Sequence, residues 1–112
     1  MNELTRQKCV PCEGGIEALS AEVAGQLMKQ LHGDWALGGS GDEIVRTYGF
    51  TNYYQTMAFV NATAWISHRE DHHPDITVSY DKCEVAYMTH AIKGISENDF
   101  ICAAKLDALF DL

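Results

Sequence analysis

Residues 75–90 read DITVSYDKCEVAYMTH, and this stretch decides the fold of the chain. Apolar and polar side chains alternate on both sides of Asp81-Lys82, which is typical of two β-strands joined by a tight turn. Alternate residues of the second strand form its apolar face: Cys83, Val85, Tyr87 and Thr89. We therefore expect antiparallel strands over residues 75–80 and 83–90, so that the start of the first lies beside the end of the second at His90.

A long helix is expected upstream of this hairpin, from about Asn52 to about Arg69. Its predicted inner face consists of residues at helical spacing: Tyr53, Met57, Val60 and Ala64. Thr51 is suited to the N-cap, and Pro74 helps to end the region that follows the helix. This pattern places His68 at or near the last helical turn.

The N-terminal half carries a shorter helix and a first hairpin. Ser20 is suited to cap this helix, and Gly33 is placed to end it. One apolar stripe is expected to face the core: Ala24, Leu27, Met28 and Leu31. Two short β-prone runs, residues 35–37 and 44–48, follow on either side of a glycine-rich connection. We expect these runs to pair as a hairpin.

A last helix is expected after Ser96, whose side chain is suited to the N-cap. Ile95 and Phe100 are spaced like a hydrophobic staple, and the inner face continues with Ala103, Leu106 and Phe110. The order α-β-β-α-β-β-α predicts an α+β fold, with a single four-stranded antiparallel sheet and three helices packed on one face. We expect residues 1–19 to form an irregular arm and residues 20–112 a single domain.

The composition indicates a globular cytoplasmic protein. Eight Lys and Arg against sixteen Asp and Glu give a formal charge of −8, which disfavours direct contact with nucleic acid. No apolar run is long enough to span a membrane, and residues 1–6 lack the apolar stretch of a signal peptide. Cys9-Val10-Pro11-Cys12 has half of a zinc-ribbon pattern, but there is no second Cys-x-x-Cys, so we expect reduced thiols.

Histidines are concentrated in one part of the chain, since four of the five are His68, His72, His73 and His90. Imidazole titrates near neutral pH and can both donate and accept a proton, so such a cluster suits acid–base catalysis. The predicted hairpin brings the segment that precedes its first strand, which contains His72 and His73, beside His90. Asp99, in the first turn of the last helix, could supply a carboxylate that orients one of the rings.

The same residues allow other interpretations. Histidines in a loop are often solvated surface residues, and Asp99 could serve only to cap the last helix. A zinc site needs three or four convergent ligands, whereas adjacent residues such as His72 and His73 tend to point in different directions in an extended chain. We therefore favour proton transfer and expect no metal.

The histidine motif resembles that of one family. His68-x3-His72-His73-Pro74, followed by Tyr80, His90 and Asp99, is similar to the pattern of the pterin-4a-carbinolamine dehydratases. The resemblance runs from about residue 35 to residue 109. It is supported by local matches elsewhere in the chain: Thr89-His90, Gly94-Ile95-Ser96-x-x-Asp99 and the N-terminal segment from Cys9 to Gly15.

The resemblance implies a reaction and an assembly. The reaction is dehydration of 4a-hydroxytetrahydropterin to quinonoid dihydropterin, which recycles the pterin of an aromatic amino acid hydroxylase. The resemblance implies no metal or organic cofactor. It does imply a homodimer or homotetramer and a hydroxylase partner. By similarity, His73 or His90 is the acid or the base and His72 lies beside the substrate ring, with supporting candidates Asp71, Pro74, Asp99 and His68.

One departure and one alternative accompany this resemblance. Relatives often carry Glu at the position of His68, so a carboxylate is missing there, and Glu70 or Asp71 could take its place. Some members of the family act as dimerisation partners of transcription factors, and some related domains act as assembly chaperones. A non-enzymatic binding module on the same fold is therefore the alternative function.

Overall fold

The computed structural model describes residues 3–10 and 17–111. The regular elements in these ranges are η1 (Glu3–Arg6), α1 (Ala21–Met28), β1 (Ala36–Gly38), β2 (Glu43–Gly49), α2 (Tyr53–Glu70), β3 (Asp75–Val78), β4 (Lys82–Tyr87), η2 (His90–Ile92) and α3 (Glu97–Ala108), where η marks a short 3-10 helix. The helices and strands confirm the predicted order α-β-β-α-β-β-α.

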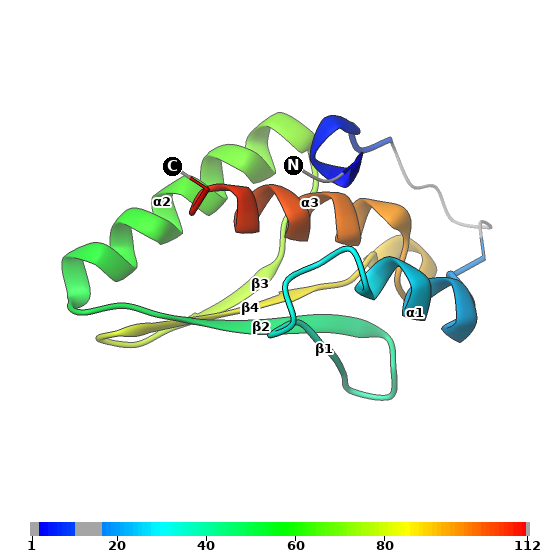
Figure 1. Cartoon of the computed structure of the whole chain (residues 1–112), viewed down its shortest axis with the longest axis horizontal. Helices are drawn as coiled ribbons and strands as arrows, with labels where there is room; N and C mark the ends of the chain where they lie inside the picture. The colour runs from blue at the N-terminus through cyan, green and yellow to red at the C-terminus, as the bar shows by residue number, and fades with distance from the viewer. Residues whose placement is uncertain (1–2, 11–16, 112) are drawn as a thin grey trace.

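The four strands form one antiparallel sheet in the order β1-β2-β4-β3, which leaves β1 and β3 as edge strands. The three α-helices cover one face, where α2 and α3 lie side by side above the strands (Figure 1). In the second hairpin Asp75 pairs with Ala86. This register brings the chain entering β3 beside the chain leaving β4, as the alternating pattern predicted.

The core lies between the sheet and α3. The predicted inner face of β4 is confirmed, because Cys83, Val85 and Tyr87 are all fully buried. Phe100 and Leu106 of α3 are also fully buried, and burying side chains of this size stabilises the fold by about 2 kcal/mol each. A tightly packed α3 is what fixes the position of its N-terminus, where Asp99 lies.

The predicted inner face of α2 is correct only in part, because Val60 packs against the core but Ala64 is exposed. Tyr53 is 48% exposed, whereas the residues that α2 buries are Thr56, Phe59, Thr63 and Glu70. The threonine hydroxyls are buried without loss because they donate to backbone carbonyls, as Thr56 does to Asn52 and Tyr80. A pattern of apolar residues alone therefore misses the buried threonines of this helix. Asn52, not Thr51, is its N-cap.

Several predicted boundaries also shift. α1 ends at Met28, ahead of Gly33, although Leu31 still packs in the core. β3 ends at Val78, so Tyr80 lies in the turn and is 64% exposed. His90 does not end β4 but begins η2. Beyond α3, Phe110 is half exposed and stacks on Tyr48.

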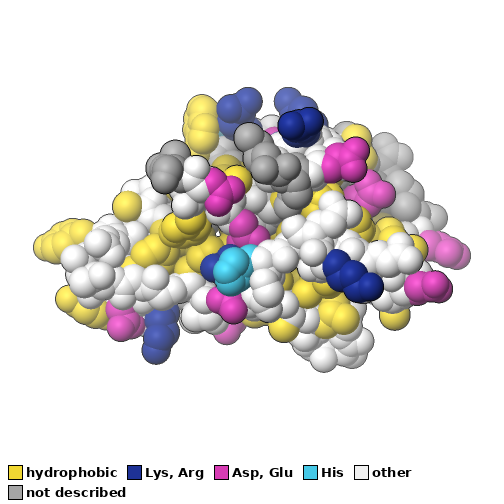
Figure 2. Space-filling model, in the orientation of Figure 1, with side chains coloured by type: hydrophobic (Ala, Val, Ile, Leu, Met, Phe, Trp, Pro, Cys, Tyr) yellow, Lys and Arg dark blue, Asp and Glu magenta, His cyan; other side chains and the backbone are white. Residues whose placement is uncertain are grey.

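The N-terminal arm contains η1, whose Leu4 is buried in the core next to α3. Cys12 lies outside the described residues, so only Cys9 of the Cys-x-x-Cys motif can be placed. On the face shown in Figure 2, basic side chains are scattered among acidic ones. Among the described helices, none combines the length and apolarity required to cross a membrane.

Candidate active site

The C-terminal cap of α2 directs His72 toward α3. Asp71 has φ 51 and ψ 42, the left-handed conformation that ends many helices and that Asp tolerates better than most residues. The backbone N–H groups of Asp71 and His72 both donate to the Ser67 carbonyl. This turn stops the helix and points the next side chain inward.

His72 is held by the carboxylate of Asp99. Its Nε2 lies 2.6 Å from Asp99 Oδ1, and the two side chains are 13% and 0% exposed. The ring also stacks on Tyr87, with centroids 6.0 Å apart and planes 10° from parallel. A carboxylate without a proton only accepts hydrogen bonds, so we assign a proton to Nε2 of His72; in the neutral tautomer with this proton, Nδ1 is the acceptor.

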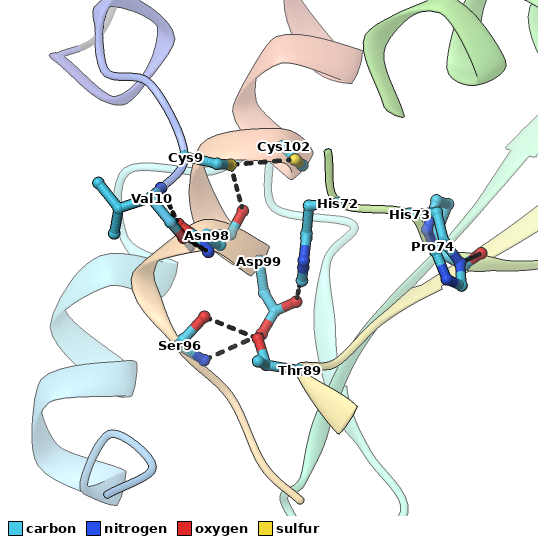
Figure 3. Close-up of polar contacts among 10 residues, drawn as sticks. All are labelled: Cys9, Val10, His72, His73, Pro74, Thr89, Ser96, Asn98, Asp99 and Cys102. Carbon is cyan, nitrogen blue, oxygen red and sulfur yellow. Dashed lines mark hydrogen bonds and ion pairs between the residues drawn. The ribbon is translucent and has the colours of Figure 1, made fainter. Parts of the chain in front are cut away.

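Asp99 is itself fixed by two further residues, Thr89 and Ser96. Its Oδ2 accepts hydrogen bonds from the Thr89 hydroxyl and from the Ser96 backbone N–H, each at 2.9 Å. The Thr89 and Ser96 hydroxyls are 2.7 Å apart, and since Thr89 donates to Asp99, Ser96 must donate to Thr89. Figure 3 shows this network around Asp99. The same carboxylate therefore caps α3 and orients His72, so both interpretations of Asp99 hold.

His73 and His90 form a second, more exposed pair. Their ring centroids are 6.3 Å apart with planes tilted by 31°, and both residues are exposed. His73 turns away from His72 in Figure 3, and its Nδ1 is 3.2 Å from the Pro74 carbonyl. The register of β3 and β4 is what brings His73 beside His90.

A hollow of about 430 Å³ connects the three histidines. His72, His73 and His90 all line it, together with Asp71 and with residues 8–10 of the N-terminal arm. Such a volume suits a small heterocyclic ligand. The described part of the chain has no group of three or more His, Cys, Asp or Glu side chains placed to hold a metal ion.

The arm is attached beside this hollow by hydrogen bonds to the side chains of Glu70 and Asn98. The Cys9 backbone N–H donates to Glu70 Oε1 at 2.8 Å, and Val10 pairs with the side-chain amide of Asn98 through both its N–H and its carbonyl. Lys105 donates to the other oxygen of Glu70 at 2.8 Å. Burial by itself would raise the pKa of Glu70, but the bonds from Cys9 and Lys105 lower it overall.

The structure separates the predicted site residues into two groups. It brings together His72, His73, His90, Asp71, Pro74 and Asp99. His68 is not among the residues that line the hollow; it lies on the exposed side of α2, with its ring 5.6 Å from that of Trp65. Sequence reasoning did not assign a site role to Thr89 or Asn98, because their partners come from distant segments.

A second hollow, of about 520 Å³, surrounds Asp107. Its carboxylate accepts hydrogen bonds from Trp35 Nε1, from Arg46 at 2.7 Å and from the Tyr48 hydroxyl at 2.6 Å. Burial, and then the Asp107 carboxylate, raises the pKa of Tyr48 well above its usual range. Because both oxygens of the Asp107 carboxylate are taken by these donors, we assign the cluster a structural role and take the histidine hollow as the candidate active site.

Comparisons with known proteins agree on one family. The family model described as "Pterin 4 alpha carbinolamine dehydratase" matches residues 17–109. A relative from Nitrosomonas europaea, named "Putative pterin-4-alpha-carbinolamine dehydratase", is 64% identical over 108 residues, which are 96% of this chain and 94% of the relative. A relative of the same name from Nitrosospira multiformis is 61% identical over 112 residues, 100% of this chain and 96% of its own.

Two solved structures share the fold. A transcriptional coactivator/pterin dehydratase from Brucella melitensis superposes with a TM-score of 0.78 at 24% identity, over 83% of this chain and 98% of that one. A pterin dehydratase-like protein identified as a RuBisCO assembly factor in the alpha-carboxysome superposes with a TM-score of 0.60 at 26% identity, over 70% of this chain and 90% of that one. At 24% identity, the likeness to the Brucella melitensis protein shows a shared fold and nothing about function.

Proposed function

Because this chain belongs to the pterin 4 alpha carbinolamine dehydratase family, we propose that it dehydrates 4a-hydroxytetrahydropterin to quinonoid dihydropterin by histidine acid–base catalysis. Residues 20–112 carry the fold of the reaction site, and the arm before them completes one wall of the hollow. The pterin would be recycled for an aromatic amino acid hydroxylase.

The reaction needs one proton donor and one proton acceptor. The bond from C4a to the hydroxyl oxygen breaks as the N5 lone pair forms a double bond to C4a, and the leaving oxygen takes a proton from a protonated histidine. A neutral histidine takes a proton from a pterin nitrogen, so that the pterin loses one molecule of water overall. Exchange with solvent restores both rings. His73 and His90, which are exposed to the hollow and near each other, suit these two roles.

His72 suits a different role. Asp99 holds it in one orientation, and stacking on Tyr87 restricts the ring further. A fixed neutral imidazole with Nδ1 free to accept a hydrogen bond can position the pterin ring and stabilise charge that develops on it. Asp99 acts through His72 and is a positioning residue.

The convergence of three histidines around one hollow carries this proposal, and a kinetic assay tests it. The carbinolamine is generated in place, and its loss is followed by absorbance against the uncatalysed rate. Replacing His73 and His90 together by Ala should lower kcat/KM by about a hundredfold or more, which is the usual contribution of acid–base catalysis. His32→Gln, a change at a partly exposed histidine outside the hollow, is the matched control. Equal rates for the double variant and the control would reject the mechanism.

We also propose that the chain forms a homodimer or homotetramer. β3 is an edge strand whose Ile76 and Val78 are each 38% exposed, and an uncovered edge can pair with a second copy. On α2, Tyr54 and Trp65 are 82% and 61% exposed. Light scattering on the purified protein measures the number of subunits, and a monomer at micromolar concentration would contradict this proposal.

A binding module without catalysis is the second candidate. An open apolar groove of about 470 Å³, with Phe50, Phe59 and Phe110 among its lining residues, lies away from the histidines, and exposed apolar surface favours protein contacts. The kinetic assay separates the two functions. A wild-type protein that gives only the uncatalysed rate would favour the binding module.

A further inference from the structure

Two thiols face each other beside the candidate active site. The Sγ atoms of Cys9 and Cys102 are 3.5 Å apart, although the residues are separated by 93 positions in the sequence. Figure 3 shows the two sulfur atoms pointing toward one another between the arm and α3. Cys9 is half-buried and lines the hollow, whereas Cys102 is fully buried. In the described part of the chain, this is the one contact between thiols.

We propose that Cys9 and Cys102 form a redox-active pair, which a low-molecular-weight disulfide such as oxidised glutathione converts into an intramolecular disulfide. The inference stands on the two thiols and their surroundings. It does not depend on the dehydratase reaction.

The geometry requires a small movement. A disulfide bond is about 2.0 Å long, so the sulfur atoms must approach by about 1.5 Å from their observed contact. Cys102 lies in the tightly packed middle of α3. Cys9 follows η1 in a segment without regular secondary structure, in which Cys9 itself bonds to Glu70 and Asn98 and the next residue, Val10, bonds twice to the Asn98 side chain. The arm can therefore supply the movement while α3 stays in place.

The chemistry proceeds by two exchanges and balances without a further reactant. The Cys9 thiolate attacks a sulfur of oxidised glutathione, which forms a mixed disulfide and releases one glutathione thiolate. The Cys102 thiolate then attacks the Cys9 sulfur and releases the second. The protein loses two protons and two electrons, and the oxidant becomes two thiols.

Exposure decides which thiol reacts first. The contact with Cys9, together with burial, raises the pKa of Cys102, and a buried thiol with a raised pKa is a poor nucleophile toward reagents in solution. Cys9 is reached through the hollow that it lines. Cys102 then reacts with a sulfur that is already in contact, so that proximity offsets its low thiolate fraction.

The bond would fix one wall of the hollow. Cys9 donates its backbone N–H to Glu70, which precedes Asp71 and His72 in the chain. A covalent tie from Cys9 to α3 would therefore hold the arm against the same helix that carries Asp99. Because it also closes a long loop in the unfolded chain, it should raise the thermal midpoint of unfolding.

The test uses the full-length protein at increasing ratios of oxidised to reduced glutathione. Free thiols are blocked with iodoacetamide, and cysteine peptides are mapped by mass spectrometry. We expect a linked peptide joining Cys9 to Cys102 before Cys83 is modified, with a thermal midpoint that rises on oxidation and falls back with reductant. Cys9→Ser and Cys102→Ala should each abolish the link and the shift, and Cys83→Ala should keep both.

Each of the other outcomes overturns the proposal. These are a bond from Cys9 to Cys12, a lasting glutathione adduct on Cys9, and a Cys102 that remains free at ratios that modify Cys83. The Cys9→Ser variant keeps the test decisive if Cys102→Ala does not fold, because Cys9 is only half-buried and lies outside regular secondary structure, whereas Cys102 is fully buried in α3.

Discussion

Replacing Asp99 by Asn should uncouple His72 from its orienting partner without changing the size of the side chain. The carboxylate accepts hydrogen bonds from His72, Thr89 and the Ser96 backbone. An amide offers one acceptor oxygen and one donor nitrogen. If the oxygen keeps Thr89 and Ser96, the amide nitrogen faces Nε2 of His72, and two N–H donors then meet. His72 can avoid this conflict by moving its proton to Nδ1.

The expected loss of stability and activity in Asp99→Asn follows from the hydrogen bond between Asp99 and His72 that it removes. A hydrogen bond to a charged and buried acceptor contributes about 1.5–3 kcal/mol, so a loss near 2 kcal/mol should lower the thermal midpoint by about 8 °C for a chain of this length. Catalysis should fall by about ten- to a hundredfold, because the ring remains in place but presents a donor where it had an acceptor. The kcat value should fall more than the KM rises.

Two measurements separate orientation from simple destabilisation. Nitrogen NMR shifts of the His72 ring report which nitrogen carries the proton, and they should show it on Nε2 in the wild type and on Nδ1 in Asp99→Asn. The dehydration assay is run well below both thermal midpoints. Unchanged ring shifts together with an unchanged kcat would refute the assignment of Asp99 as the positioning residue.

Two further predictions concern polar contacts away from the histidines. In the folded chain the pKa of Glu70 is lowered, so its carboxylate stabilises the fold above the usual pKa and this contribution is lost as the pH falls through the lowered value. Glu70→Gln should therefore flatten the acid side of a plot of unfolding free energy against pH, and an unaltered slope would contradict this. Asp107→Asn should reduce the free energy of unfolding by about 2–3 kcal/mol, because the amide removes the charge that pairs with Arg46 and keeps one acceptor oxygen for donors that now share two. Denaturant titration measures this change, and a change below experimental error would refute the structural role.

The sheet and the pairing of His73 with His90 could be predicted from the sequence because both depend on local rules. Alternation set the faces of β4, and the turn at residues 79–82 set the register. The inner face of α2 could not be predicted in this way. Thr56 and Thr63 are buried because their hydroxyls find backbone acceptors, and one of these acceptors, the Tyr80 carbonyl, lies in another element.

The hydrogen bond between His72 and Asp99 could not be predicted from local sequence patterns, because it also depends on how distant elements pack. Sequence placed Asp99 at the start of the last helix, but the packing of α3 on the sheet decides what the carboxylate faces. One carboxylate has two oxygens, and here the cap uses Oδ2 while Oδ1 is left for the histidine. A residue that local rules assign to a cap can therefore also serve a site.

The carboxylates near the hollow can be ranked by what already holds them. The family resemblance implies a Glu where this chain has His68, and Glu70 and Asp71 are the two candidates to replace that carboxylate. Glu70 is 9% exposed, and its two oxygens are taken by Cys9 and Lys105. Freeing Glu70 for a ligand would leave the partly buried Lys105 ammonium without its anion, which is unfavourable. Asp71 is exposed, lines the hollow and uses its backbone to end α2. Of the two, Asp71 is therefore the carboxylate that can reach a bound pterin while the fold stays intact.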